Sequence, residues 1–61
     1  MRIKITKELP LEDKYRRLAP IGSEHEVVRI QDDWRSKLYF IELAGTEVGV
    51  FQREECEVVE P

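Results

Sequence analysis

The stretch LYFIELAGTEVGVFQ, residues 38–52, decides the fold of this chain. Residues 38–43 are apolar on both faces except at Glu42, a pattern typical of the central strand of a sheet. A tight turn follows at 44–45, and residues 46–52 then predict the returning strand of a β-hairpin. The sequence therefore indicates a β-protein built around this hairpin.

Shorter candidate strands lie on both sides of the hairpin. Residues 2–5 alternate polar and apolar side chains with a period of two, as a half-buried strand does. Residues 25–31 predict a further strand, which a polar loop at 32–37 joins to the hairpin. A single 3₁₀ turn at 53–55 is expected before a last short strand at 56–59. Because five short strands cannot bury enough apolar surface in a flat sheet, we expect an all-β fold curled into a small barrel or two orthogonal sheets.

Between the first two predicted strands, the spacing of apolar residues changes from that of a strand to that of a helix. Leu11, Tyr15 and Leu18 are spaced to lie on one face of a helix. Pro10 suits the start of this helix and Pro20 its end. We therefore expect a short helix that docks those three apolar side chains onto the strands, with an irregular loop over the same residues as the alternative.

A single domain spanning residues 1–61 is expected. A chain of this length buries only about 60% of its unfolded surface, so nearly every apolar residue must serve the core or a partner. Leu18 and Tyr15 are expected to pack over one end of the core. The expected core consists of apolar strand residues: Ile3, Ile5, Val28, Ile30, Ile41, Leu43, Phe51 and Val58.

The composition excludes several classes of protein. Hydrophobic residues make up 41% of the chain, too high a fraction for a disordered tail. The single cysteine cannot form an internal disulfide or a zinc site built on several cysteines and histidines. The sequence contains no run of roughly 18 apolar residues, so no membrane span is predicted. No apolar signal segment follows Met1 and Arg2, so we expect a cytoplasmic protein.

The order of strands and loops resembles that of an SH3-like barrel. The excursion at 6–23 matches its RT loop, the loop at 32–37 its n-Src loop, and the turn at 44–45 its distal hairpin. Residues 49–51 (GVF) and 57–59 (EVV) are similar to the glycine–aromatic stretch and the final valine strand of that fold. The resemblance implies a five-stranded SH3-like barrel with a short helix in its first long loop. It is closest to the small SH3-like proteins of bacteria, phages and mobile elements.

The peptide-binding motifs of eukaryotic SH3 domains are replaced in this chain. Leu38 and Tyr39 stand where those domains carry a tryptophan pair, and residues 52–55 (QREE) replace their Pro-Ser-Asn-Tyr turn. The glycine-rich, basic loops of the RNA-holding KOW modules are also missing. The resemblance therefore implies the barrel without implying polyproline or RNA as its ligand.

Trp34 is the residue that most strongly suggests a function. It lies in a polar loop between acidic residues and Arg35, so its ring is either a lid on the barrel end or an exposed anchor for a partner. Tryptophan is enriched at binding hot spots. We therefore expect a non-catalytic protein-interaction module, whose protein partner the sequence does not identify. The expected site consists of Trp34, Tyr39, Tyr15 and Arg35.

A nucleic-acid-binding module is the alternative. Basic residues outnumber acidic ones over residues 1–20, whereas acidic residues predominate afterwards and the formal net charge is −3. Such a module would use Lys4, Lys7, Lys14, Arg16 and Arg17. The negative balance argues against it, because the acidic residues would repel the phosphate backbone.

Catalysis, metal binding and a cofactor are not expected. His25 alternates along its strand with Glu24 and Glu26, so it points to the opposite face from both and forms no acid–base pair with them. Cys56 is surrounded by glutamates, which raise the pKa of a thiol and disfavour the reactive thiolate.

Overall fold

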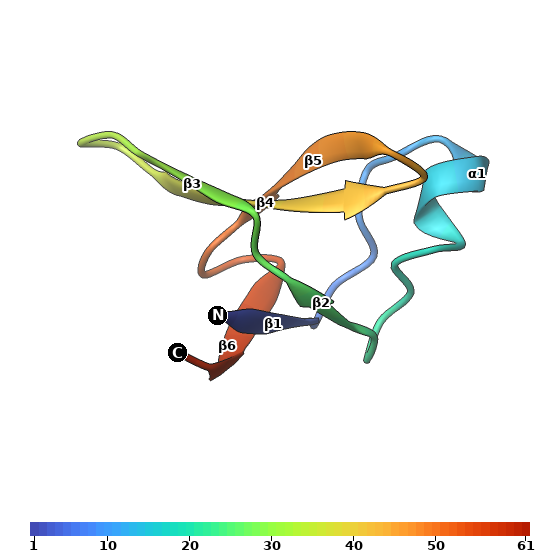
Figure 1. Ribbon diagram of the computed structural model, residues 1–61, viewed down its shortest axis with the longest axis horizontal. Coiled ribbons are helices and arrows are strands. Elements are labelled where there is room, and N and C mark those ends of the chain that lie inside the picture. The colour runs from blue at the N-terminus through green and yellow to red at the C-terminus, as the bar shows by residue number, and fades with distance from the viewer.

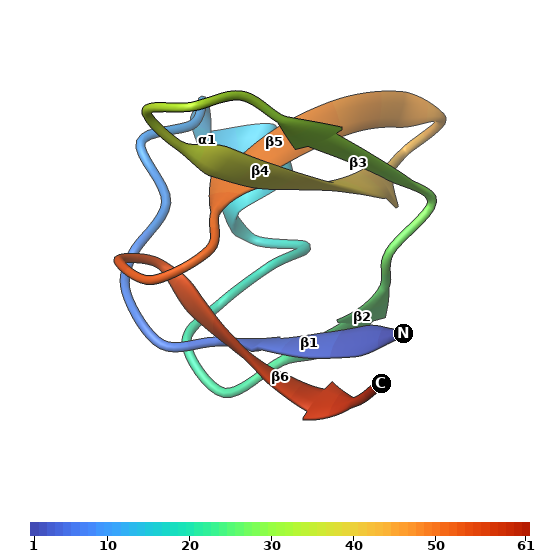
Figure 2. The same ribbon diagram turned by 90° about the vertical axis from the view of Figure 1, so that its left-hand side faces the viewer.

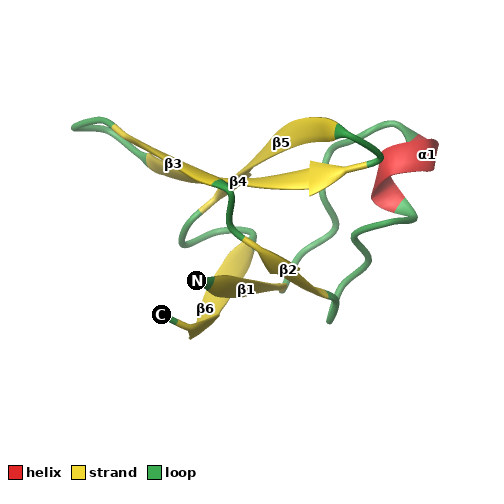
Figure 3. Ribbon diagram, in the orientation of Figure 1, coloured by secondary structure: helices red, strands yellow, loops and turns green.

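The computed structural model describes all residues 1–61 and contains six strands and one helical turn. In chain order these are β1 (Arg2–Ile5), α1 (Asp13–Arg16), β2 (Glu24–Glu26), β3 (Arg29–Asp32), β4 (Lys37–Leu43), β5 (Thr46–Phe51) and β6 (Cys56–Glu60). The predicted all-β class is confirmed, and the number of strands is six in place of five. The expected helix is limited to the single turn of α1, so almost all of the chain is strand and loop (Figure 3).

The strands form two antiparallel sheets of three strands each. The first sheet has the order β2-β1-β6 and the second the order β3-β4-β5. The two sheets lie one above the other, with the excursion that carries α1 at one end (Figures 1 and 2). Each sheet therefore covers the apolar inner face of the other.

The sixth strand arises because the segment predicted as one strand at 25–31 crosses from one sheet to the other. The Val27 N–H donates to the Met1 carbonyl at 2.9 Å, whereas the next N–H, of Val28, donates to the Phe40 carbonyl at 2.8 Å. Arg29 is also the ladder partner of Phe40, so two consecutive residues face one residue of β4. This is the pattern of a β-bulge, which bends the strand and directs β2 and β3 into different sheets.

The turn between β4 and β5 adopts the tight geometry that the sequence predicts. Ala44 and Gly45 have φ angles of 52° and 78°. Positive φ at both central residues is typical of a type I′ turn, whose twist matches that of the flanking strands. Ala44 is the only residue other than glycine with a positive φ, so the turn contains a side chain in an unfavourable backbone region.

The core lies between the two sheets. Ile3 and Ile5 of β1 and Ile41 and Leu43 of β4 are buried, as predicted. The buried cluster also contains residues that the sequence analysis did not assign to it: Leu9, Ala19, Tyr39, Val50 and Cys56. Two of these come from the excursion between β1 and β2, which therefore closes the core instead of only connecting strands.

The prediction that Val28 and Ile30 belong to the core is wrong. Their side chains are 49% and 45% exposed. The bulge at 28–29 interrupts the alternation with period two, so the two residues no longer share one face. In addition, β3 is an edge strand, and its hairpin with β4 extends beyond the first sheet (Figure 1). No second layer covers this part of the hairpin.

Three further residues predicted to be buried are exposed: Phe51, Val58 and Leu18. On β5 the inward residue is Val50, which pairs with the buried Tyr39, so the neighbouring Phe51 faces outward. Val58 lies on the edge strand β6, next to a register shift. Leu18 follows the end of α1, so the helical spacing that would have turned it toward the core is not maintained.

Backbone hydrogen bonds fix both ends of the excursion between β1 and β2. The Thr6 N–H donates to the Glu55 carbonyl at 2.9 Å, and the Gly22 N–H donates to the Ile5 carbonyl at 2.7 Å. Between these points, Tyr15 of α1 is half-buried against the core. No helix of the structure has the length and the apolar character that crossing a membrane requires.

Candidate functional site

The loop between β3 and β4 holds Trp34 at the tip of the projecting hairpin. The Asp33 carboxylate accepts hydrogen bonds from the backbone N–H groups of Arg35 at 2.7 Å and Ser36 at 3.2 Å. The Asp33 N–H in turn donates to the Ser36 carbonyl at 3.1 Å. These bonds within the loop form an Asx-type turn, which fixes the backbone on both sides of the tryptophan.

Trp34 is 86% exposed, more than any other large hydrophobic residue of the chain. This exposure excludes the lid and confirms the alternative in which the ring stands free of the core. The Arg35 guanidinium lies over the ring, 4.4 Å from its centroid, in a cation–π arrangement. The side chain is therefore supported on one side by Arg35 and is accessible elsewhere.

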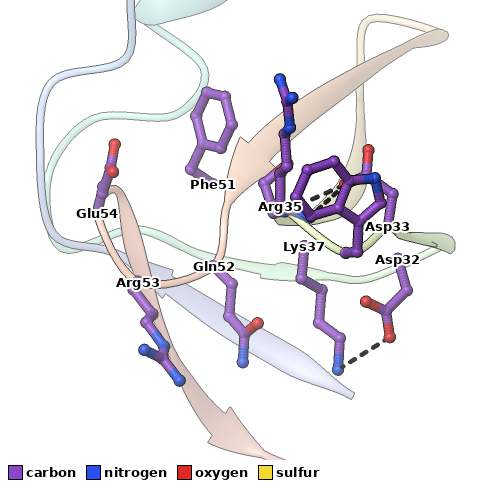
Figure 4. Close-up of a pocket in the computed structure, with 10 residues that line it drawn as sticks. Asp32, Asp33, Arg35, Lys37, Phe51, Gln52, Arg53 and Glu54 are labelled. Atoms are coloured by element: carbon purple, nitrogen blue, oxygen red, sulfur yellow. Dashed lines mark hydrogen bonds and ion pairs between the residues drawn. The ribbon is translucent and has the colours of Figure 1, made fainter.

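A pocket of about 390 Å³ lies beside Trp34, between the hairpin loop and the turn that joins β5 to β6 (Figure 4). Only two of its ten lining residues are hydrophobic, Trp34 and Phe51. Polar and charged side chains form the rest of its walls. We call Trp34, Arg35, Phe51 and this pocket the hairpin-tip surface.

Several charged groups of the hairpin-tip surface are already engaged within the chain. The Lys37 ammonium lies 3.7 Å from the Asp32 carboxylate. In contrast, Arg35, Arg53 and Glu54 form no ion pair. The pocket therefore presents two unpaired cations and an unpaired anion next to an exposed aromatic ring.

Glu55 holds the turn that forms one wall of the pocket. Its carboxylate accepts a hydrogen bond from the Phe51 N–H at 3.0 Å, while its own N–H donates to the Phe51 carbonyl at 3.1 Å. The second bond spans four residues, so the turn is wider than the predicted 3₁₀ turn. The sequence analysis treated Glu55 only as one of the glutamates around Cys56, and nothing in the spacing of these residues indicates that it is buried.

Cys56 lies next to this turn with its thiol buried. Its Sγ donates weakly to the carbonyls of Phe51 and Gln52, each at 3.6 Å. Burial, and then the negative charge of Glu55, raise the pKa of the Cys56 thiol to about 11. The thiol therefore stays protonated near neutral pH, and its environment is that of a structural residue.

The structure does not assemble the predicted site as one surface. Tyr39 is buried in the core, because it lies on the inner face of the central strand β4 opposite Val50. Tyr15 is half-buried on α1, and α1 and the β3–β4 loop lie at opposite ends of the long axis (Figure 1). Of the four predicted residues, only Trp34 and Arg35 are brought together.

Only one of the five basic residues of the alternative site, Arg16, forms an ion pair. Lys4 on β1 faces Glu24 on one side and Glu57 on the other in the strand register. Arg16 pairs with Glu8 at 3.4 Å and also with Asp13.

The remaining three basic residues of the group have no carboxylate partner. The Lys14 ammonium lies 5.0 Å from the centroid of the Tyr15 ring, while Lys7 and Arg17 are exposed and form no ion pair. Glu8, Glu12 and Asp13 lie in the same excursion, so it does not present cations alone, as a stripe for phosphate binding would.

His25 is half-buried on β2, where the Ser23 hydroxyl lies within hydrogen-bonding distance of its Nε2, at 2.8 Å. Burial, and then the positive charge of Arg2, lower the pKa of His25 below its usual value. The neutral ring is therefore a structural partner of the turn before β2. No three His, Cys, Asp or Glu side chains of the structure are grouped closely enough to hold a metal ion.

The chain was compared with known protein families, curated proteins and solved structures. No protein-family model, no curated protein and no solved structure matches it. The site therefore has to be interpreted from its own geometry.

Proposed function

We propose that this chain is a non-catalytic protein-interaction module and that the hairpin-tip surface is its partner site. The observation that carries the proposal is the exposure of Trp34 on a loop that its own hydrogen bonds keep in place. An exposed tryptophan on an ordered backbone can be buried by a partner at little cost in conformational entropy. Tryptophan and arginine, which stand side by side here, are among the residues most enriched at binding hot spots.

The proposed fold is an SH3-like barrel. Support comes from the strand order, in which β1 pairs with both β2 and the last strand while β3, β4 and β5 form the second sheet. The crossing at Val27 and Val28 adds to this support, because one bent segment then contributes to both sheets. In this proposal the β3–β4 loop and the β5–β6 turn border the binding surface at the n-Src position of the barrel.

A protein is preferred over nucleic acid as the partner because of the distribution of charge. The formal net charge is −3, and the cations of the hairpin-tip surface alternate with carboxylates. A surface for a phosphate backbone would instead gather unpaired cations along one face. In the basic first third, Arg16 is paired with Glu8 and Asp13, and Lys4 lies between two glutamates in the strand register, so this region supports the nucleic-acid alternative less than the sequence suggested.

Selection of binding peptides from a random displayed library tests the proposal. Trp34→Ala should weaken the binding of the selected peptides to the chain by about 2 kcal/mol or more, a roughly 30-fold loss of affinity. Ile21→Ala is a matched control, because Ile21 is also an exposed apolar residue but lies outside the hairpin-tip surface. Equal affinity for the wild-type chain and Trp34→Ala would refute the assignment, as would a selection that yields no binder.

A further inference from the structure

The outer edge of β3 is a regular sheet edge with one exposed apolar side chain, and its charged side chains are paired within the chain. Edge strands expose unpaired backbone groups to which another chain can hydrogen-bond, and proteins usually block them with charge, bulges or short length. The two sheets have four such edges, on β2, β6, β3 and β5.

The free backbone groups of β3 follow from its register. The Gln52 N–H donates to the Lys37 carbonyl at 3.0 Å, so Lys37 directs its backbone groups toward β5. Hydrogen-bonded and non-hydrogen-bonded pairs alternate along antiparallel strands. The β3 partner of Lys37, Asp32, therefore directs its N–H and C=O away from β4, and Ile30, two residues earlier, does the same.

The side chains along this edge suit a strand partner. Ile30 is 45% exposed, and no other sheet covers it. The charges on β3 are already neutralised, since Arg29 pairs with Glu47 at 2.9 Å and Asp32 with Lys37. An approaching strand would therefore meet one apolar side chain and the free backbone groups of Ile30 and Asp32. It would meet no unpaired charge.

The edge of β5 is less suitable. The N–H and C=O of Phe51 are both taken by Glu55. By the same alternation, the groups left open on this edge belong to Gly49 and Glu47. A glycine offers no side chain for a neighbouring strand to pack against, and a glutamate places a charge there.

The edges of β2 and β6 are also blocked. β2 has only three residues, and two of them are the glutamates Glu24 and Glu26. β6 exposes Val58 and Val59, but it also carries Glu57 and Glu60, and its register against β1 shifts between Arg2 and Ile3. Short length, charge and irregular register are the usual means by which an edge is protected.

We propose that the partner binds as an added β-strand along the edge of β3, in continuity with Trp34 at the tip of the same hairpin. The proposal rests on the function proposed above and names its binding mode. The partner segment is extended and carries apolar residues at alternate positions, because successive side chains of a strand face opposite sides and only the side of Ile30 is apolar. The backbone of the partner segment forms hydrogen bonds with the backbone of Ile30 and Asp32. The continuation of that segment reaches the hairpin-tip surface.

A flexible segment fits this edge better than a second copy of the chain. β3 has four residues and is about 13 Å long at ~3.3 Å per residue. Two folded copies paired through this edge alone would bury far less than the roughly 1,000 Å² that a stable interface needs. A flexible segment can add contacts with Trp34 and the adjacent pocket.

Amide hydrogen exchange of the wild-type chain tests the proposal directly. In the free protein, the Ile30 and Asp32 amides should exchange faster than that of Gln31, which the alternation directs to β4. Saturation with the selected peptides should protect both amides. A complex in which neither amide gains protection would refute strand addition, and so would protection already present in the free chain at low concentration.

Substitution at Ile30 separates this inference from the proposed function. Ile30→Pro removes the backbone N–H that points away from β4. It should lower the affinity of the selected peptides by about five- to tenfold, the effect of one lost hydrogen bond. Ile30→Val keeps the N–H and should leave affinity within about twofold. Peptides that lose affinity with Trp34→Ala but not with a folded Ile30→Pro would leave the binding function standing and refute strand addition. Protection that appears without peptide as the protein concentration rises would identify a second copy as the occupant and overturn the proposal.

Discussion

Ile41 and Ile30 allow the same substitution to be compared at two sites that the sequence pattern could not distinguish. Ile41 is fully buried on β4, whereas Ile30 is 45% exposed on β3. Ile41→Ala removes three buried carbon atoms, which costs roughly 2–2.5 kcal/mol at ~0.8 kcal/mol for each. A remaining void of about 50 Å³ adds about 1 kcal/mol at ~24 cal/mol per Å³. The expected loss is therefore about 3–4 kcal/mol, compared with about 1 kcal/mol or less for Ile30→Ala.

A loss of this size is most of the stability of a chain of this length, which is about 3–9 kcal/mol at ~0.05–0.15 kcal/mol per residue. Urea titration followed by far-ultraviolet circular dichroism measures both variants. Tryptophan emission is a poor probe of this transition, because Trp34 is exposed in the folded state as well. Equal losses for the two variants would refute the assignment of the core to the space between the sheets.

Four further outcomes follow from individual side chains. Native Trp34 should emit at long wavelength and be quenched readily by acrylamide, with Trp34→Ala changing stability by less than about 0.5 kcal/mol; a blue-shifted, protected emission would contradict its exposure. Since burial and Arg2 lower the pKa of His25, the unfolded chain binds the proton more readily, so stability should fall as the pH drops below 6.5, and His25→Gln should flatten this dependence. With a pKa of about 11, Cys56 should react with a disulfide reagent at pH 8 much more slowly in the native than in the unfolded chain. Ala44→Asn should raise stability by about 0.5–1 kcal/mol, since asparagine tolerates the positive φ of this turn better than alanine.

Local features of the fold were predictable from the sequence because neighbouring residues determine them. The β4–β5 hairpin follows from an apolar run, a two-residue turn and a returning strand, all within residues 38–52. The burial of Ile41 and Leu43 follows from the same stretch. The paired residues of this hairpin all lie within the same stretch, so the sequence pattern contains the necessary information.

Features that depend on partners distant in the sequence were not predictable in the same way. An alternation of apolar residues does not reveal that Val27 bonds to one sheet and Val28 to the other. The exposure of Ile30 depends on how far the hairpin extends past the first sheet, which no local pattern encodes. The sequence also could not decide whether the Trp34 ring is buried as a lid or exposed, because this depends on the position of the loop relative to the core.

The pairing of β1 with both β2 and β6 also has a consequence for the order of folding. Arg2 pairs with Glu60, so β1 is completed only by a strand that lies more than fifty residues later in the sequence. The meander of β3, β4 and β5 needs only short loops, and loop closure is faster and less costly for near neighbours. We therefore expect this meander to form first and the β1–β6 pairing to be the slow, closing event. Pulse-labelled refolding would then show early protection of the Ile41 amide and late protection of the Lys4 amide, which the alternation along β1 directs toward β6, like that of Thr6. During synthesis, the first sheet would be completed only after residues 56–60 have left the ribosome.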